Sequence, residues 1–322
     1  MKMTRKEIVL SAITASILAT DSFADVNPEN VASALVKVET EAYKVDYEDI
    51  TFHELFDVIN LNDRTATSFA YYYLTESGKA QLSNSDGSIA WVDSMIKMKQ
   101  APLHDGNVGY RYSMKELERV AKLGTSLDGI KVETAINASL SLAQEICFFG
   151  DESRDIVGFF NNPDIPTISP KAGANGNDWE NKTPKEILAD INYLFATAFT
   201  RTKQQEFKVN SKTNRLMLPT AKFSYIATTP LSEVSDTTIL EFIVNKSVYI
   251  TCKENVIPTP QMAENSIRIY QKDKKKVAFY WGHMVDFKAP QQDNLEFKVA
   301  GDFSIGGLAL RKPMSVFEME GI

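Results

Sequence analysis

Apolar residues recur at helical spacing in a long stretch near the middle of the chain. Ser113 and Glu116 form a Ser-x-x-Glu pattern, which is typical of a helix N-terminus because each side chain can cap a backbone N–H. Two glycines and several cap formers at 124–129 predict that this first helix ends there. A second, longer helix is predicted over about 128–148, with Gly150 as its stop. Its apolar face comprises Val132, Ile136, Leu140, Ala143 and Cys147.

Two further helices are predicted in the C-terminal half. Thr183 as N-cap, Pro184 at the first helical position and Glu186 at the third mark the start of one. Its wide apolar face contains Ile187, Leu188, Ile191, Leu194, Phe195 and Ala198. Ser235 and Asp236 are predicted to begin the other. Its apolar residues are Ile239, Leu240, Ile243 and Val244.

Runs rich in β-branched and aromatic residues alternate with these helices and predict strands. They lie at 67–75, 89–93, 215–218, 248–252, 267–270, 277–281, 295–299 and 308–310. The first two runs enclose turn formers, so 65–112 is predicted to contain a long two-stranded ribbon. The basic run 272–276 is interpreted as a solvated hairpin turn between the flanking strands. Residues 30–60 are expected to begin as a helix and to become extended around 50–56.

Three blocks of the sequence carry a family resemblance. The first block comprises Leu127-Asp128, Ile146–Asp151, Ile156–Gly158 and Asn162-Pro163. The second comprises Leu216–Pro219, Tyr225–Thr229 and Ser235–Glu241. The third comprises Leu295–Phe297, Gly301, Gly306-Gly307, Arg311–Pro313 and Gly321-Ile322. Through these blocks the chain, over roughly 67–322, resembles the major capsid proteins of tailed bacteriophages with the Hong Kong 97-type fold. The resemblance is to a branch of phage and prophage capsid proteins that is also related to encapsulins.

The resemblance implies an α+β Hong Kong 97-type phage capsid fold in five parts. These are an N-terminal arm and lead-in (1–60), an extended E-loop ribbon (61–112), a P-domain with a long spine helix (113–160), an A-domain (161–290) and return strands of the P-domain (291–322). The implied function is structural. Pentamers and hexamers would self-assemble in the cytoplasm of a host bacterium into an icosahedral virion capsid that encloses double-stranded DNA. Portal, scaffolding and decoration proteins are further expected partners.

Composition and charge agree with such a role. The chain has 322 residues with 43% hydrophobic content, which is ample for a core. Its net charge of -7 argues against a sequence-independent nucleic-acid binder, which needs clustered Lys and Arg, but is compatible with a shell around DNA. The two cysteines, Cys147 and Cys252, are too few for a disulfide framework and are interpreted as reduced packing residues.

Candidate chemistry is sparse. The three histidines, His53, His104 and His283, lie far apart in the sequence and have no Cys or carboxylate at metal-ligand spacing. Phosphate-binding loops, dinucleotide fingerprints, nucleophile elbows and zinc-protease motifs do not occur in the sequence. We therefore expect no enzyme activity, no cofactor and no metal site. No run approaches the ~20 apolar residues of a membrane span, so no membrane partner is expected.

The predicted ribbon supplies the candidate contact residues, since aromatic and Met side chains are favoured in interface cores. Intersubunit contacts are expected at Tyr71, Tyr73, Trp91, Met95 and Met98. Burial of each within its own domain is the alternative. Some relatives of the fold join subunits by a Lys to Asn or Asp isopeptide bond, for which Lys97 or Lys99 could be the donor.

Two other functions remain open at this point. An encapsulin-type bacterial compartment would use the same fold to enclose a cargo enzyme. A secreted or surface binding protein is suggested by the first 26 residues, where a basic start and an apolar stretch precede Ser22-Phe23-Ala24. Against a signal peptide, Glu7 interrupts the pattern and the apolar residues fall at helical spacing, which favours an arm that packs on a neighbouring subunit.

Overall fold

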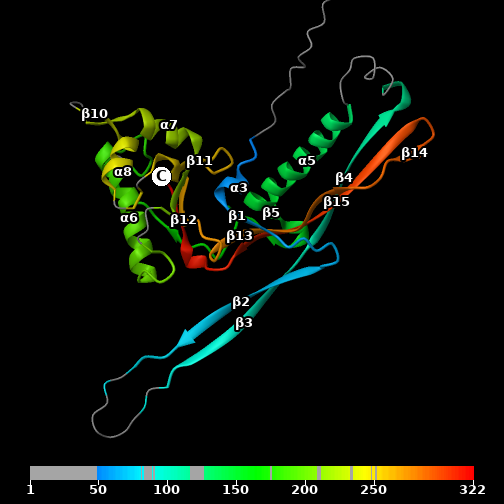
Figure 1. Cartoon of the computed structure of the whole chain (residues 1–322). Helices are drawn as coiled ribbons and strands as arrows, with labels where there is room; N and C mark the ends of the chain where they lie inside the picture. Colours follow the sequence, from blue (N-terminus) through cyan, green and yellow to red (C-terminus); the bar gives the residue numbers. More distant parts are fainter. Residues whose placement is uncertain are drawn as a thin grey trace, which may run out of the picture. The chain divides into compact units, whose positions relative to one another are not determined.

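The computed structural model describes residues 49–80, 82, 89, 91–116, 127–174, 176–208, 212–232, 235–247, 249–250 and 252–322 (Figure 1). Side chains are described for these residues except 73–77, 127–129 and 235. Several of the sequence predictions lie outside this part of the chain. They are the N-terminal arm as far as residue 48, the helical face at 117–123, the break at 124–126 and the turn at 83–88.

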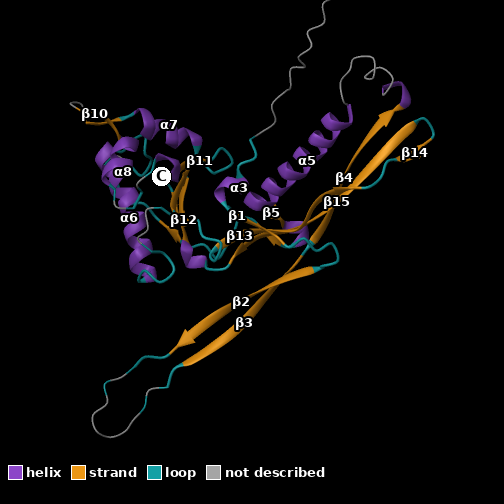
Figure 2. Cartoon of the chain, in the orientation of Figure 1, coloured by secondary structure: helices purple, strands orange, loops and turns teal. Residues whose placement is uncertain are grey.

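One sheet is organised around the strand β15. Its members are β1 (Asp57–Asn60), β4 (His104–Ser113), β13 (Val277–Phe287), β14 (Gln291–Asp293) and β15 (Glu296–Leu310). β15 is antiparallel to β13 and β14 along one side and to β4 along the other (Figure 2). β1 joins β13 in parallel. The predicted strands at 295–299 and 308–310 are therefore two parts of a single strand.

A second sheet has five strands in the order β11-β8-β12-β16-β7. Their bounds are Val256–Pro258, Asn214–Leu218, Ser266–Gln271, Val316–Glu320 and Thr167–Ile168, respectively. The helices α6 (Pro184–Thr202), α7 (Thr220–Thr228) and α8 (Ile239–Lys246) share a buried cluster with this sheet. Its members include Ile191, Leu194, Phe195, Leu216, Ile226, Ile243, Ile267 and Phe317. A short pair, β9 (Pro230–Ser232) and β10 (Ser235–Thr238), lies between α7 and α8 in the sequence.

The predicted spine helix is present as α5 (Leu127–Phe149), and the predicted cap at Ser113 also forms, since its hydroxyl accepts the backbone N–H of Glu116. The last turns of α5 are buried at Ala143, Ile146, Cys147 and Phe148, whereas Ile136 on the predicted apolar face is exposed. Gly150 ends the helix with φ +72, and a Cβ there would lie 2.1 Å from the carbonyl oxygen of Ile156. Only glycine fits this turn, in which β5 (Gly150–Asp151) pairs with β6 (Ile156–Val157) around a 3-10 turn, η1 (Glu152–Arg154).

Of the two helix starts predicted in the C-terminal half, one is confirmed and one is wrong. The prediction for α6 is confirmed, because Thr183 and Glu186 form a reciprocal capping box ahead of Pro184. The predicted start of α8 at Ser235 and Asp236 is wrong, because these residues lie in β10. The helix begins three residues later, where Thr238 and Glu241 form a capping box of their own.

The predicted ribbon consists of β2 (Ser68–Ser77) and β3 (Asp93–Pro102), which pair in antiparallel register (Figure 1). The residues that follow do not belong to it, because β4 pairs with β15 in the first sheet.

One predicted pairing is wrong. The strands at 267–270 and 277–281 exist as β12 and β13, but β12 pairs with β8 and β16 whereas β13 pairs with β1 and β15. The basic run between them connects two sheets and is not a solvated hairpin turn. Lys276 within it is buried, and its ammonium donates to the side chain of Gln271.

Two local predictions also fail. Residues 50–56 are not extended throughout, because a short helix, α3 (Phe52–Leu55), buries Phe52 and Leu55 before β1 begins. No strand forms at the described positions 249, 250 and 252. Ile250 is fully buried there as an irregular segment, and the ring of Tyr249 stacks on Phe195 with centroids 5.0 Å apart.

Each of the two sheets contains strands from both sides of the predicted boundary at residue 290. β13 precedes this boundary but pairs with β15, and β16 follows it but pairs with β12. The assignment of the five parts as capsid domains stays a prediction.

A buried ion pair joins the second sheet to the segment after the spine helix. Arg268 on β12 lies 2.6 Å from Glu318 on β16, and its guanidinium also donates to the backbone carbonyls of Phe159 and Phe160. Burial raises the pKa of the Glu318 carboxyl, and the attraction of Arg268 only partly opposes this. The pair therefore stabilises the fold only while both partners are present.

Replacing Arg268 with Met tests this pair. We expect R268M to lower the free energy of unfolding by about 3–5 kcal/mol, because it leaves a buried carboxylate without a partner. The double variant R268M/E318M should recover much of the loss, since it removes both charges. Urea denaturation followed by tryptophan fluorescence measures both effects, and equal stability of R268M and the unsubstituted protein would contradict the account.

Candidate subunit interfaces

The register of β2 and β3 assigns each ribbon residue to one of two faces, because directly paired residues point to the same side. One face carries Phe69 and Tyr71 with their partners Ala101 and Lys99, and continues along β3 with Lys97 and Met95. The other carries Ala70 and Tyr72 with their partners Gln100 and Met98, and continues along β3 with Ile96. The five predicted contact residues therefore do not share one face.

The root of the ribbon packs on its own chain. The ring of Phe69 is buried and stacks on Tyr280 of β13, with centroids 4.1 Å apart. Tyr71 is half-buried, and its ring lies 5.1 Å from the guanidinium of Arg311. A Cβ at Gly306 would lie 2.6 Å from the Phe69 ring, so glycine is needed where the ribbon meets β15. Tyr71 thus helps to anchor the root, and an intersubunit contact there stays a prediction.

Beyond the root, large apolar side chains are exposed. Trp91 is 84% exposed, Tyr72 71% and Ile96 69%, and Met95 and Met98 are each more than half exposed. Tyr72, Ile96 and Met98 lie on the same face. We call these three residues the apolar ribbon face. The Tyr73 side chain lies outside the described residues.

Large apolar side chains that are exposed together on one face are typical of a surface that binds another protein. Met98 on this face was predicted from the sequence, whereas Tyr72 and Ile96 were not. The alternation of side chains along β3 would have found Ile96, and Tyr72 could be added only once the register of β2 against β3 was known.

Lys97 and Lys99, the predicted isopeptide donors, lie on the face opposite the apolar ribbon face. Lys99 lines a cleft of about 200 Å³ together with Asp155, Asn162 and Asp164. The structure thus places Lys99 near carboxylate and amide side chains of its own chain. A covalent bond at either lysine stays a prediction.

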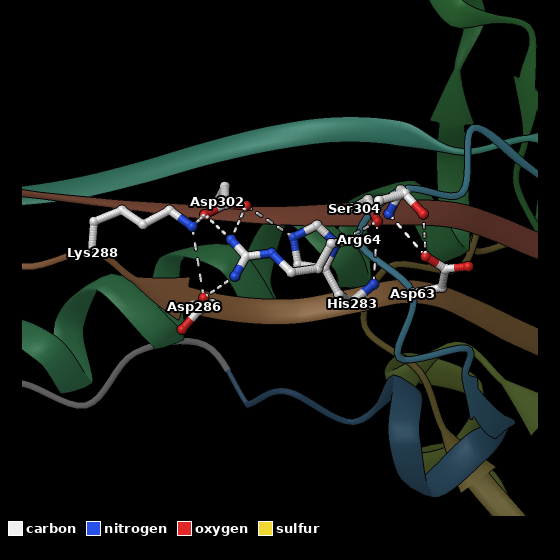
Figure 3. A network of polar contacts seen from close by, with 8 residues as sticks. Asp63, Arg64, His283, Asp286, Lys288, Asp302 and Ser304 are labelled. Carbon is white, nitrogen blue, oxygen red and sulfur yellow. Dashed lines mark hydrogen bonds and ion pairs between the residues drawn. The ribbon is translucent and has the colours of Figure 1, made fainter.

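A polar network lies on the first sheet beside the segment that leads into the ribbon (Figure 3). Arg64, between β1 and β2, bonds to Asp286 on β13 and lies 2.6 Å from Asp302 on β15. The Lys288 ammonium lies 2.9 Å from Asp302, and His283 lies 3.3 Å from the same carboxylate. Hydrogen bonds from Lys288 and Arg64 hold the pKa of Asp302 well below its ordinary range.

The network can hold segments of the fold together but is poorly suited to acid–base chemistry. With its pKa so low, Asp302 stays an anion at neutral pH and does not exchange a proton there. No group of three His, Cys, Asp or Glu side chains that could hold a metal ion occurs among the described residues. Within the same part of the chain, no helix is long and apolar enough to cross a membrane. The network instead ties the start of the ribbon to two strands of the sheet.

Comparison with known proteins establishes the family. The family model of the major capsid protein matches residues 78–322, so the chain belongs to the major capsid protein family. It is therefore a structural protein of a capsid shell. The search of curated proteins gives no match.

Solved structures share the fold. The capsid of Myoviridae Phage XM1 has a TM-score of 0.70 at 15% identity, over 94% of this chain and 100% of that chain. The capsid of an empty GTA particle has a TM-score of 0.63 at 8% identity, over 93% and 99%. A virus-like particle from Pyrococcus furiosus has a TM-score of 0.50 at 15% identity, over 84% and 92%. The predicted α+β Hong Kong 97-type capsid fold is thereby confirmed.

Neutralising Asp302 tests the network. Because the folded pKa of Asp302 is lowered, its contribution to stability is present above the unfolded value of about 3.9 and fades as pH falls below it. We expect D302N to lower the melting temperature by about 2 °C at pH 7, and the gap to the unsubstituted protein should narrow below about pH 4.

Thermal unfolding at pH 7, 4 and 3 measures this gap. D293N is the matched control, since Asp293 forms its ion pair with Lys298 on the neighbouring strand, away from Arg64. A gap between D302N and the unsubstituted protein that stays constant from pH 7 to 3 would count against the assignment.

Proposed function

We propose that this chain forms pentamers and hexamers that close into an icosahedral shell around double-stranded DNA. The apolar ribbon face carries the proposal. A two-stranded ribbon is marginally stable in water unless it packs on something, and among the described residues its packing on its own chain is at the root. A neighbouring subunit would supply further cover, as the resemblance implies for the E-loop, which lies across an adjacent subunit in that family.

The usual composition of obligate interfaces supports assembly through the ribbon. Obligate interfaces commonly bury about 2,000 Å² or more, and their cores are enriched in aromatic and Met residues. Tyr72, Trp91, Met95 and Met98 have this composition, and these four residues and Ile96 are exposed. We assign intersubunit contacts to these residues, while Tyr71 acts mainly at the root.

DNA would be enclosed rather than bound in a sequence-specific manner. The net charge of -7 supplies little attraction to phosphates, which suits a wall along which a genome must move. The chain would be assembled in the cytoplasm of its bacterial host, together with portal, scaffolding or decoration proteins. Its role would be structural, without catalysis.

A compartment that encloses a cargo enzyme is the second candidate. It is supported by the likeness of the fold to the virus-like particle from Pyrococcus furiosus. The contents of particles purified from cells separate the two: long double-stranded DNA supports the phage capsid, and a co-purified enzyme supports the compartment.

Placing charges on the apolar ribbon face tests the proposal. We expect I96K/M98K to fold normally but to assemble at least about 100-fold less readily, because burying an unpaired ammonium costs several kcal/mol. Sedimentation velocity measures the assembled fraction, and circular dichroism checks the fold.

The matched control is I96V/M98L, which keeps both positions apolar and should assemble like the unsubstituted protein. Full assembly of I96K/M98K would show that this face is not an interface.

A further inference from the structure

The strand β4 has one edge that pairs with β15 and one edge that does not. The ladder with β15 continues in the bond from the Met114 N–H to the Leu295 carbonyl, which fixes the alternation along β4. Val108 and Tyr110 therefore direct their backbone groups toward β15. The residues whose backbone groups point away from β15 are Asp105, Asn107, Gly109 and Arg111.

This outer edge is accessible. Asp105, Asn107, Gly109 and Arg111 are all exposed, and for Gly109, which has no side chain, the exposed surface is backbone. No second strand pairs with the edge among the residues that the structure describes. On this edge the carbonyl oxygen of Arg111 accepts from the Lys131 ammonium at 2.7 Å. A carbonyl oxygen has two lone pairs, so this contact leaves room for another donor.

The outer edge of β4 is complementary to the same edge of a second copy of the chain. In an antiparallel pair of two β4 strands related by a two-fold axis at Val108, Asp105 faces Arg111 of the second copy, and Arg111 faces the second copy's Asp105. Asn107 faces Gly109 in the same way. All four positions are those whose backbone groups point outward, so the register that matches opposite charges also pairs the free N–H and C=O groups.

We propose that β4 pairs with β4 of a second copy and joins the two five-stranded sheets into one. The inference rests on the proposed function in that a shell brings copies of this chain into contact. The contact is isologous, with the same patch used by both subunits, as in most two-fold interfaces. Pairing also removes an exposed strand edge, which native proteins rarely leave open.

Small residues lie along the two strands behind this edge. A hollow of about 580 Å³ lies over β4 and β15, and its lining includes Gly109 and Ala300, which add little or no side chain. Arg111 pairs with Glu296 at 3.9 Å, and both side chains are exposed. Its guanidinium can therefore reach a carboxylate across the axis without breaking a buried contact.

A single cysteine at Val108 tests the register directly. Residues that face each other in a non-hydrogen-bonded antiparallel pair have Cα atoms about 4.5 Å apart, within the range of a disulfide. In a C252S background, which removes the exposed native thiol, oxidised V108C particles should give a covalent dimer on a non-reducing gel. K246C, an exposed position on α8, is the control and should remain monomeric.

A charge exchange gives an independent test. Asp105→Arg alone and Arg111→Asp alone each create two like-charge pairs across the axis, so the yield of assembled particles should fall about tenfold. The double variant D105R/R111D restores opposite charges and should recover most of the yield. This rescue is specific to the proposed register, because a merely destabilised fold would be damaged further by the second substitution.

The outcomes separate this inference from the proposed function. Shells of the unsubstituted protein combined with no V108C dimer and no rescue would overturn the pairing of β4 and leave the shell standing. The protein could instead form the V108C dimer, with dimer formation recovered in D105R/R111D, and yet never close into shells. That result would support the pairing of β4 and contradict the proposed function.

Discussion

The pairing of β15 along both of its sides is the interaction on which the rest of the structure depends. β13 and β14 occupy one side and β4 the other, so strands far apart in the sequence share one sheet. The helix α5 packs on this sheet through Ile146 and Phe148, and the ribbon docks on it through Phe69. Gly306 permits that docking, because any side chain there would collide with the Phe69 ring. The position of the ribbon root thus depends on Tyr280 of β13 and on Gly306 of β15.

The same arrangement leaves surfaces that the described part of the chain does not cover. The sheet buries the root of the ribbon but not Tyr72, Ile96 and Met98 farther along it. β15 likewise satisfies one edge of β4 and leaves the other open. A protein that acted as a monomer would expose both at a cost in solubility, whereas a shell subunit can bury both against its neighbours. The structural role of the major capsid protein family agrees with these unsatisfied surfaces.

Local signals predicted the elements well, and pairing was the main source of error. Thr183, Glu186 and Gly150 marked helix ends correctly, because capping depends on residues within one turn. β12 and β13 were found as strands but paired wrongly, since their partners lie far away in the sequence, as β1 does from β13. The same limit affected the ribbon. Its existence and Met98 followed from composition, whereas placing Tyr72 on the same face as Met98 needed the register.

Electron microscopy of the purified full-length protein, with sedimentation of the same sample, tests the central claim most directly. The account predicts closed particles of uniform size, or free pentamers and hexamers that convert to them as concentration rises. A compact monomer at every concentration tested, with the apolar ribbon face still exposed, would contradict it.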